Sequence, residues 1–197
     1  GSFSEDGERL VTIASEGEIL VWDGRTGAAL RQLVGHDDRA IVGAKFNFSA
    51  GLGHLFATTC YDQTIRIWNV DTGETVRVYR GLHSRPTGSW WGVDSDRFMC
   101  VEERGVLHVW RPDAQAWPKV FSATEGEIER AQFVAGGEHV VVVTDSESVE
   151  VLDWRSGELV AQHQWSDAAA EVSHVDSSRV VAVGSEERVG RVLEWSF

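Results

Sequence analysis

The chain has 197 residues, 42% of them hydrophobic, and a formal net charge of −13 at pH 7. This length and apolar content suffice for a buried core in one domain or at most two. The acidic charge excludes a basic surface for a phosphate backbone, and no apolar run of about 18 residues is present, so we expect neither a nucleic-acid nor a membrane partner.

The N-terminus, GSFSEDGERL, is too acidic and polar for a secretory signal peptide. Cys60 and Cys100 lie in apolar runs without the spacing of metal ligands, and we interpret them as buried, reduced thiols. These features predict a cytoplasmic protein. The composition, rich in Arg, Val, Gly and Ala with Lys45 and Lys119 as its lysines, is typical of a high-GC bacterium.

Short β-branched segments bounded by Gly, Asp or Ser follow one another along the chain, which is the pattern of strands. The clearest group of four is 41–48, 54–60, 64–70 and 75–80. The nearly continuous apolar runs at 139 and 179 predict strands with both sheet faces covered. The sequence therefore predicts an all-β protein built from four-stranded units.

One segment recurs through the sequence. Aligned on an apolar-Trp pair or its equivalent, successive copies are spaced by 46, 42, 42 and 41 residues. The copies are ILVWDGRTGAALRQLVGHD at 19–37, IRIWNVDTGETVRVYRGLH at 65–83, LHVWRPDAQAWPKVF at 107–121, VEVLDWRSGELVAQHQW at 149–165 and GRVLEWSF at 190–197. We expect a single segment, 1–197, with repeats at approximately 1–37, 38–83, 84–123, 124–165 and 166–197.

These repeats resemble the WD-repeat (WD40) β-propeller family, most closely in FSEDGERLVTIASEGEILVWD at 3–23 and LFATTCYDQTIRIWN at 55–69. The resemblance implies a WD40-type β-propeller in which each repeat is a blade. The chain holds about 4.5 four-stranded blades, whereas family rings most often have seven. We therefore expect an incomplete arc, the C-terminal part of a longer propeller, with the remaining blades supplied by missing residues, another chain or another copy.

The family ties each blade together with a hydrogen-bonded His, Ser or Thr, Asp and Trp. In the second repeat the resemblance assigns these roles to His36, Thr58, Asp62 and Trp68. A catalytic triad is the alternative interpretation, but no nucleophile elbow surrounds Thr58. The other repeats depart from the set: Cys100 and Arg104 replace the hydroxyl and the Asp in the third, and Leu152 and Leu193 replace Trp in the last two, with Trp154 and Trp195 two residues on.

Nothing in the sequence predicts catalysis. The seven histidines lack HExxH or CxxC companions, and the acidic pairs, such as Glu102-Glu103, are interpreted as solvated charges. We expect no enzyme, no cofactor and no metal.

A binding platform is favoured, because propellers present loops on a rigid scaffold. The family docks partners on the rim formed by the loop before the innermost strand and the turn between the second and third strands. Tyr, Trp and Arg dominate interface hot spots. The adjacent Trp90 and Trp91 should face opposite ways, one of them between blades and the other toward the axis or rim, unless both fill the wedge between blades. We predict these partner-binding residues: Asp38, Arg39, Tyr61, Arg85, Trp91, Arg104 and Trp165.

Two functions follow. The first is a protein-interaction or sensing module within a larger regulatory polypeptide, because bacterial signalling ATPases and kinases resemble this in carrying such propellers at their C-termini. The second is a purely structural scaffold in a multi-subunit assembly. A propeller enzyme or lectin is a third alternative.

Overall fold

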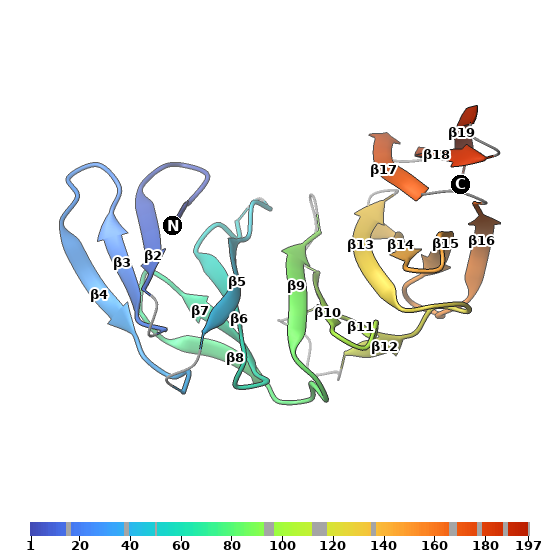
Figure 1. Ribbon diagram of the computed structural model, residues 1–197. Helices are drawn as coiled ribbons and strands as arrows, with labels where there is room; N and C mark the ends of the chain where they lie inside the picture. Colours follow the sequence, from blue (N-terminus) through green and yellow to red (C-terminus); the bar gives the residue numbers. More distant parts are fainter. Residues whose placement is uncertain are drawn as a thin grey trace. The chain divides into compact units, whose positions relative to one another are not determined.

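The structure is a computed structural model that describes residues 1–14, 17–37, 40–49, 51–92, 97–111, 118–134, 137–165, 169–176, 179–186 and 189–196 (Figure 1). Their side chains are described except at 169–176, 179–180, 182–186, 189–191 and 196. These residues form nineteen β-strands in five antiparallel sheets. No helix among them is long and apolar enough to cross a membrane.

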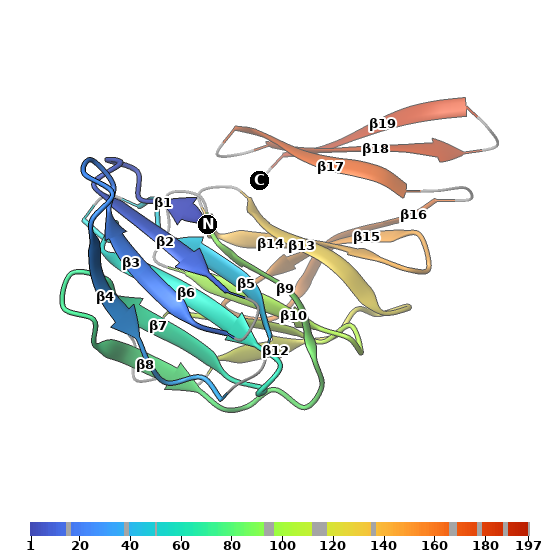
Figure 2. The same cartoon turned by 60° about the vertical axis from the view of Figure 1, so that its left-hand side comes forward.

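The chain divides into two compact units, Gly1–Trp91 and Gly92–Phe197. In the first unit every strand of a sheet pairs with the next one along the chain (Figures 1 and 2). Blade 1 consists of β1 (Ser2–Phe3), β2 (Arg9–Ile13), β3 (Ile19–Asp23) and β4 (Ala29–Leu33). Blade 2 consists of β5 (Ile41–Phe46), β6 (Leu55–Cys60), β7 (Ile65–Asn69) and β8 (Thr75–Tyr79), and the unit ends with β9 (Pro86–Trp91), which lies beside β5.

The second unit repeats this meander. Blade 3 has the strand order β9-β10-β11-β12. Its strand β9 belongs to the first unit, and the other three belong to the second: β10 (Phe98–Glu102), β11 (Leu107–Trp110) and β12 (Lys119–Phe121). Blade 4 consists of β13 (Ile128–Val134), β14 (His139–Thr144), β15 (Ser148–Asp153) and β16 (Leu159–Gln164). Blade 5 has three described strands, β17 (Ala169–Asp176), β18 (Arg179–Glu186) and β19 (Val189–Ser196). The predicted four-stranded sheets are confirmed for blades 1–4.

The core of the first unit lies between blades 1 and 2. Val11 and Val21 of blade 1 share one buried cluster with Phe46, Phe56 and Trp68 of blade 2. The rings of Phe46 and Phe56 meet edge to face with centroids 4.8 Å apart. Phe56 is also paired with Trp68 across β6 and β7, so both rings lie on one side of the sheet.

The core of the second unit contains a valine-rich cluster on blade 4. Val141, Val151 and Trp165 belong to it, and Leu193 and Trp195 of blade 5 pack against it. Residues two apart on a strand face the same side, so Trp195 and Leu193 cover the same surface. Blade 5 therefore still packs an indole against blade 4, although its Trp stands two positions after the place that the repeat pattern gives it.

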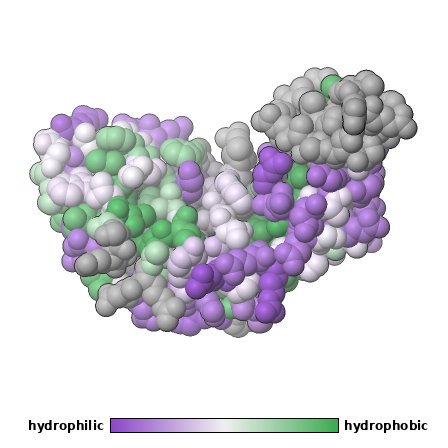
Figure 3. All heavy atoms as spheres, viewed as in Figure 1, coloured by the Kyte–Doolittle hydropathy of each residue, from purple (hydrophilic) through white to green (hydrophobic). Residues whose placement is uncertain are grey.

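Hydrophobic side chains also reach the surface of the first unit, over its sheets, on the face seen in Figure 3. The most exposed large ones are Phe3, Val34 and Phe48. Hydrophobic residues scattered singly are ordinary on protein surfaces.

Candidate functional site

Four side chains of blade 2 form one hydrogen-bonded network. Trp68 Nε1 donates to Thr58 Oγ1 at 2.8 Å. His36 Nε2 lies 2.7 Å from the same oxygen, and His36 Nδ1 lies 2.8 Å from Asp62 Oδ2. A neutral imidazole protonated at Nδ1 satisfies every contact, because it donates to Asp62 and accepts from Thr58. The network joins the loop before β5 to the β6–β7 turn and to β7.

Burial sets the charge state of this network. It lowers the pKa of His36 below the ordinary value of 6.5, although Asp62 acts in the opposite direction. At Asp62 burial acts to raise the pKa, but hydrogen bonds from Thr64 and His36 outweigh it and hold the pKa below the ordinary 3.8. Near neutral pH a neutral His36 therefore faces a charged Asp62.

The lowered pKa of His36 predicts acid destabilisation. As the pH falls through about 6.5, the unfolded chain takes up the His36 proton before the folded chain does, so the stabilisation that is complete above this pH is progressively lost. Asp62 adds a second loss below its ordinary pKa of 3.8. We expect urea unfolding at pH 8, 7, 6 and 5 to show a smaller loss of stability in His36→Gln than in the unchanged chain. Equal losses in the two proteins would contradict the assignment of His36.

Cys60 lies beside the same network, which the sequence did not predict. Ligand atoms of His36, Cys60 and Asp62 all lie within 4.8 Å of one another, and these are residue types that bind metals. Burial raises the pKa of the Cys60 thiol to about 11, however, and both nitrogens of His36 already contact blade 2 partners. We interpret the cluster as part of the structural network.

The rim of the first unit carries an ordered aromatic and cationic pair. Tyr61 follows β6, and Arg85 precedes β9. The Arg85 guanidinium carbon lies 5.1 Å from the centroid of the Tyr61 ring. The backbone N–H of Tyr61 donates to the Ala40 carbonyl at 3.1 Å, which fixes the turn against the loop before β5. Two predicted site residues therefore meet, on backbone that the His36 network holds in place.

Gln63 completes this rim patch in a costly backbone conformation. Its φ is 63°, a left-handed value that glycine adopts most easily. Gly17, Gly105 and Glu147 stand at the same place in the turns of blades 1, 3 and 4, also with positive φ. The Gln63 side chain is exposed at this turn. Tyr61, Gln63 and Arg85 are called the rim patch below.

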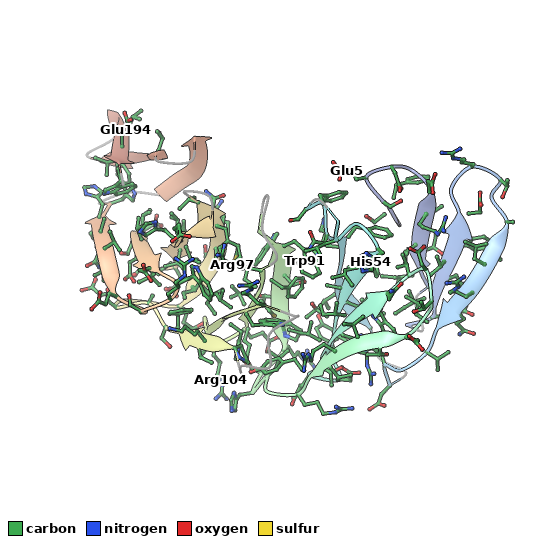
Figure 4. All side chains as sticks on the ribbon, turned by 180° about the vertical axis from the view of Figure 1, so that it is seen from behind. Glu5, His54, Trp91, Arg97, Arg104 and Glu194 are labelled. Carbon is green, nitrogen blue, oxygen red and sulfur yellow. The ribbon has the colours of Figure 1, made fainter. Side chains whose placement is uncertain are left out.

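One predicted partner-binding residue of the first unit, Trp91, does not join this patch. Trp91 is the last residue of β9, at the opposite end of that strand from Arg85, and its Nε1 donates to the Lys45 carbonyl of β5 at 3.0 Å. Figure 4 labels it. Its assignment to the partner-binding rim stays a prediction, and its indole is hydrogen-bonded to the neighbouring innermost strand. Asp38 and Arg39 lie outside the described residues.

Trp165 was also predicted on the rim, and the structure corrects this. The side chain is 3% exposed and belongs to the core cluster of blade 4. The ring of His163 meets it edge to face, with centroids 4.6 Å apart. A tryptophan at the end of an outer strand can turn either to solvent or inward, and here the apolar surface of blade 4 takes it inward.

In the second unit, exposed and buried charged side chains lie side by side at the β10–β11 turn. Arg104 and Glu103 are exposed, and Figure 4 shows Arg104 projecting from its turn. Glu102 is 2% exposed and His108 is fully buried, and Glu102 Oε1 and His108 Nε2 form a hydrogen bond. The interpretation of Glu102-Glu103 as two solvated charges was therefore wrong for Glu102. The contact between Glu102 and His108 was not predicted from the sequence.

The chain is similar in sequence to proteins that contain WD repeats. Residues 27–69 match the family model described as "WD domain, G-beta repeat". The chain is 25% identical over 194 residues to eukaryotic translation initiation factor 3 subunit I of Neosartorya fischeri, a match that covers 90% of this chain and 56% of that protein. It is 27% identical over 112 residues to human WD repeat and SOCS box-containing protein 1, covering 56% of this chain and 26% of the other. The chain thus spans about half the length of the translation factor subunits it matches.

Solved structures show the fold. The β-propeller domain of Myceliophteria thermophila Cps50 (Swd1) superposes with a TM-score of 0.74 at 15% identity, covering 97% of this chain and 62% of that domain. The computationally designed Ika8 protein gives a TM-score of 0.72 at 22% identity, covering 96% of this chain and 56% of that one. Residues 27–69 therefore match a WD repeat, and the chain has the fold of a β-propeller like those of the WD40 type.

Proposed function

We propose that this chain is a protein-interaction module that binds a partner through the rim patch of its first unit. The observation that supports this most is the ordered contact between Arg85 and Tyr61 beside a left-handed Gln63. Tyr and Arg are the residue types that contribute most to protein interfaces. A side chain held in place before binding loses less conformational entropy on binding. The patch is thus suited to recognition of a partner.

We also propose that this chain is part of a larger protein. We propose one propeller segment of five repeats whose remaining blades come from missing residues, another chain or another copy, within a bacterial regulatory polypeptide of the signalling ATPase or kinase kind. The translation factor relatives are longer than this chain, which supports further blades. A cytoplasmic location is part of the proposal, and the buried thiols of Cys60 and Cys100 support a reducing compartment. Arg104 is proposed as a second contact on the rim of the second unit.

Affinity capture with three matched variants tests the rim patch. Arg85→Ala removes the guanidinium, and Gln63→Gly removes the amide side chain while keeping a backbone conformation that glycine adopts freely. Arg77→Ala is the control, because this exposed arginine lies on β8, the outer strand of blade 2. Proteins retained by the unchanged chain would be identified by mass spectrometry and titrated against each variant.

We expect Arg85→Ala and Gln63→Gly to weaken the binding of a genuine partner by about fivefold or more, and Arg77→Ala to leave it unchanged. Thermal unfolding should show Arg85→Ala within about 0.5 kcal/mol of the unchanged chain and Gln63→Gly at least as stable. If all three variants bind equally, the rim patch is not the interface.

A structural scaffold in a multi-subunit assembly is the second candidate, favoured by relatives whose name describes a subunit. A scaffold would hold its partner permanently, whereas a sensing module would exchange it. The dissociation rate of the captured partner separates the two: release within seconds to minutes supports sensing, and co-purification through prolonged washing supports the scaffold.

A further inference from the structure

We infer that the partner segment bound at the rim patch is acidic, with Asp or Glu carboxylates that pair with the guanidinium groups of Arg85 and of nearby Arg66. This rests on the proposed function of the patch. The net charge of the chain is unevenly spread, because the first unit has 9 Lys or Arg and 11 Asp or Glu, whereas the second has 9 and 20. The formal charges are thus −2 and −11, so an acidic segment meets less repulsion at the first unit.

The sequence around Arg85 is locally basic. No Asp or Glu stands between residues 74 and 94, a stretch that contains three arginines. The carboxylate of the β6–β7 turn, Asp62, is 4% exposed and is already hydrogen-bonded to His36 and Thr64. Asp62 is therefore occupied within its own network and does not serve as a counter-ion for Arg85.

Arg85 presents a guanidinium without an acceptor. Its carbon lies over the Tyr61 ring, so the ring covers one face of the planar group. Within the part of the chain that the structure describes, the N–H groups at its edge make no hydrogen bond or ion pair. Arg9, Arg25 and Arg155, by contrast, each pair with a carboxylate. Because Arg85 is exposed, an incoming carboxylate can accept two of its N–H donors at once.

Arg66, the second residue of β7, is a second guanidinium of this kind. It lies over the Trp68 indole, 5.8 Å from the ring centroid, and a Cβ atom at Gly35 would come within 2.7 Å of its Nη1. Its charge acts to lower the pKa of His36, so it lies near the network that holds the rim patch. The side chain is half-buried and has no acceptor among the described residues. A charge partly removed from water is stabilised by an incoming carboxylate.

The surroundings of the two guanidiniums favour carboxylates over phosphates. Arg85 lies over Tyr61 and Arg66 over Trp68, so each stands with its own aromatic neighbour. A doubly charged phosphate is best held by a cluster of arginines, whereas a single guanidinium matches the one charge and two oxygens of a carboxylate. Asp37 is exposed on the loop before β5 but, among the described residues, is ion-paired with neither arginine. A segment with two acidic residues would satisfy both.

Two labelled peptides test the inference by fluorescence anisotropy. Gly-Ser-Glu-Glu-Glu-Ser-Gly is the acidic probe, and Gly-Ser-Gln-Gln-Gln-Ser-Gly is the neutral one. The chain as a whole carries −13, which repels an acidic peptide, so a preference for the acidic probe has to come from a local site. We expect the acidic probe to bind about fivefold or more tightly than the neutral one at about 50 mM salt, and the preference to shrink at about 500 mM.

Three variants locate the binding. Arg85→Gln and Arg66→Gln should each weaken binding of the acidic probe about threefold or more. Arg80→Gln is the matched control, because it removes the same charge from an exposed arginine that follows β8, and it should change binding by less than about twofold. Arg85 is exposed, so Arg85→Gln should keep the thermal stability of the unchanged chain, even if Arg66→Gln disturbs the packing on Trp68.

Equal binding of the two probes, or equal binding of the acidic probe to the unchanged chain and to Arg85→Gln, would overturn the inference. A phosphoserine probe of the same length that binds more than about tenfold tighter would also overturn it, since the ligand would then be a phosphate. The proposed function is judged separately, on the captured partner. If Arg85→Ala and Gln63→Gly release that partner while the acidic probe shows no preference, the rim patch is the interface for a neutral segment.

Discussion

Replacing Trp68 with alanine is expected to lower the free energy of unfolding by about 3–5 kcal/mol, the usual cost of removing a large buried aromatic ring. Trp68 is fully buried in the cluster between blades 1 and 2, and its Nε1 donates to Thr58. Alanine would leave a cavity against Phe56 and remove one hydrogen bond of the network. Urea unfolding of the unchanged and variant chains, followed by tryptophan fluorescence and circular dichroism, measures the difference.

Two further variants separate packing from hydrogen bonding. Trp68→Phe keeps an aromatic ring but removes the indole N–H, so we expect a smaller loss, with about 1 kcal/mol of it from the hydrogen bond. Trp22→Ala is the matched control in blade 1, where Trp22 Nε1 donates to Thr12 Oγ1 at 2.8 Å but the ring is only half-buried. If Trp22→Ala destabilised the chain as much as Trp68→Ala, blade 2 would not have the central structural role assigned to it.

The second large effect is expected at the buried pair of blade 3. His108→Leu should destabilise the chain by about 3–5 kcal/mol, because it takes a hydrogen-bonding partner from a carboxyl group that is itself buried. Replacing both residues, Glu102→Leu with His108→Leu, should recover most of this loss, since no buried carboxyl then remains. Urea unfolding of the two single variants and the double variant gives the coupling between the residues.

A coupling near zero would contradict the assignment of Glu102 and His108 as one structural unit. Glu103→Leu is the matched control on the same turn: Glu103 is exposed, so its replacement should change the stability by no more than about 0.5 kcal/mol. A large effect of Glu103→Leu would show instead that the turn as a whole is sensitive to substitution.

The sequence predicted the strands and the Trp68 network well for a physical reason. The same pattern of strands and turns recurs about every 42 residues, so each repeat supports the interpretation of the others. Turns with Gly, Asp or Asn also mark the ends of the strands. His36, Thr58, Asp62 and Trp68 are far apart in sequence, yet the strand register of one blade brings them together. The resemblance to WD repeats predicted that these four residues would meet.

The departures could not be predicted in the same way. Cys100 is paired with His108 across β10 and β11, and Glu102, two residues along β10 from Cys100, lies on the same face of the sheet, where it meets His108. Glu102 and His108 do not belong to the family pattern. Trp165 follows an outer strand, where a local pattern does not decide between solvent and core. Trp165 lies inward because it packs against the valine cluster of blade 4, and that cluster is formed by residues far from Trp165 in the sequence as well as near it. Gln63 shows its strain only in the backbone angle.

Hydroxyl-radical footprinting of the chain with and without its captured partner tests the interaction rim most directly. Tyr61 is the reporter in the rim patch, and Phe48 is the internal reference, an exposed aromatic ring in the loop between β5 and β6. The account predicts that the partner lowers the oxidation of Tyr61 several-fold and leaves Phe48 unchanged. Unchanged oxidation of Tyr61 in a saturated complex would contradict it.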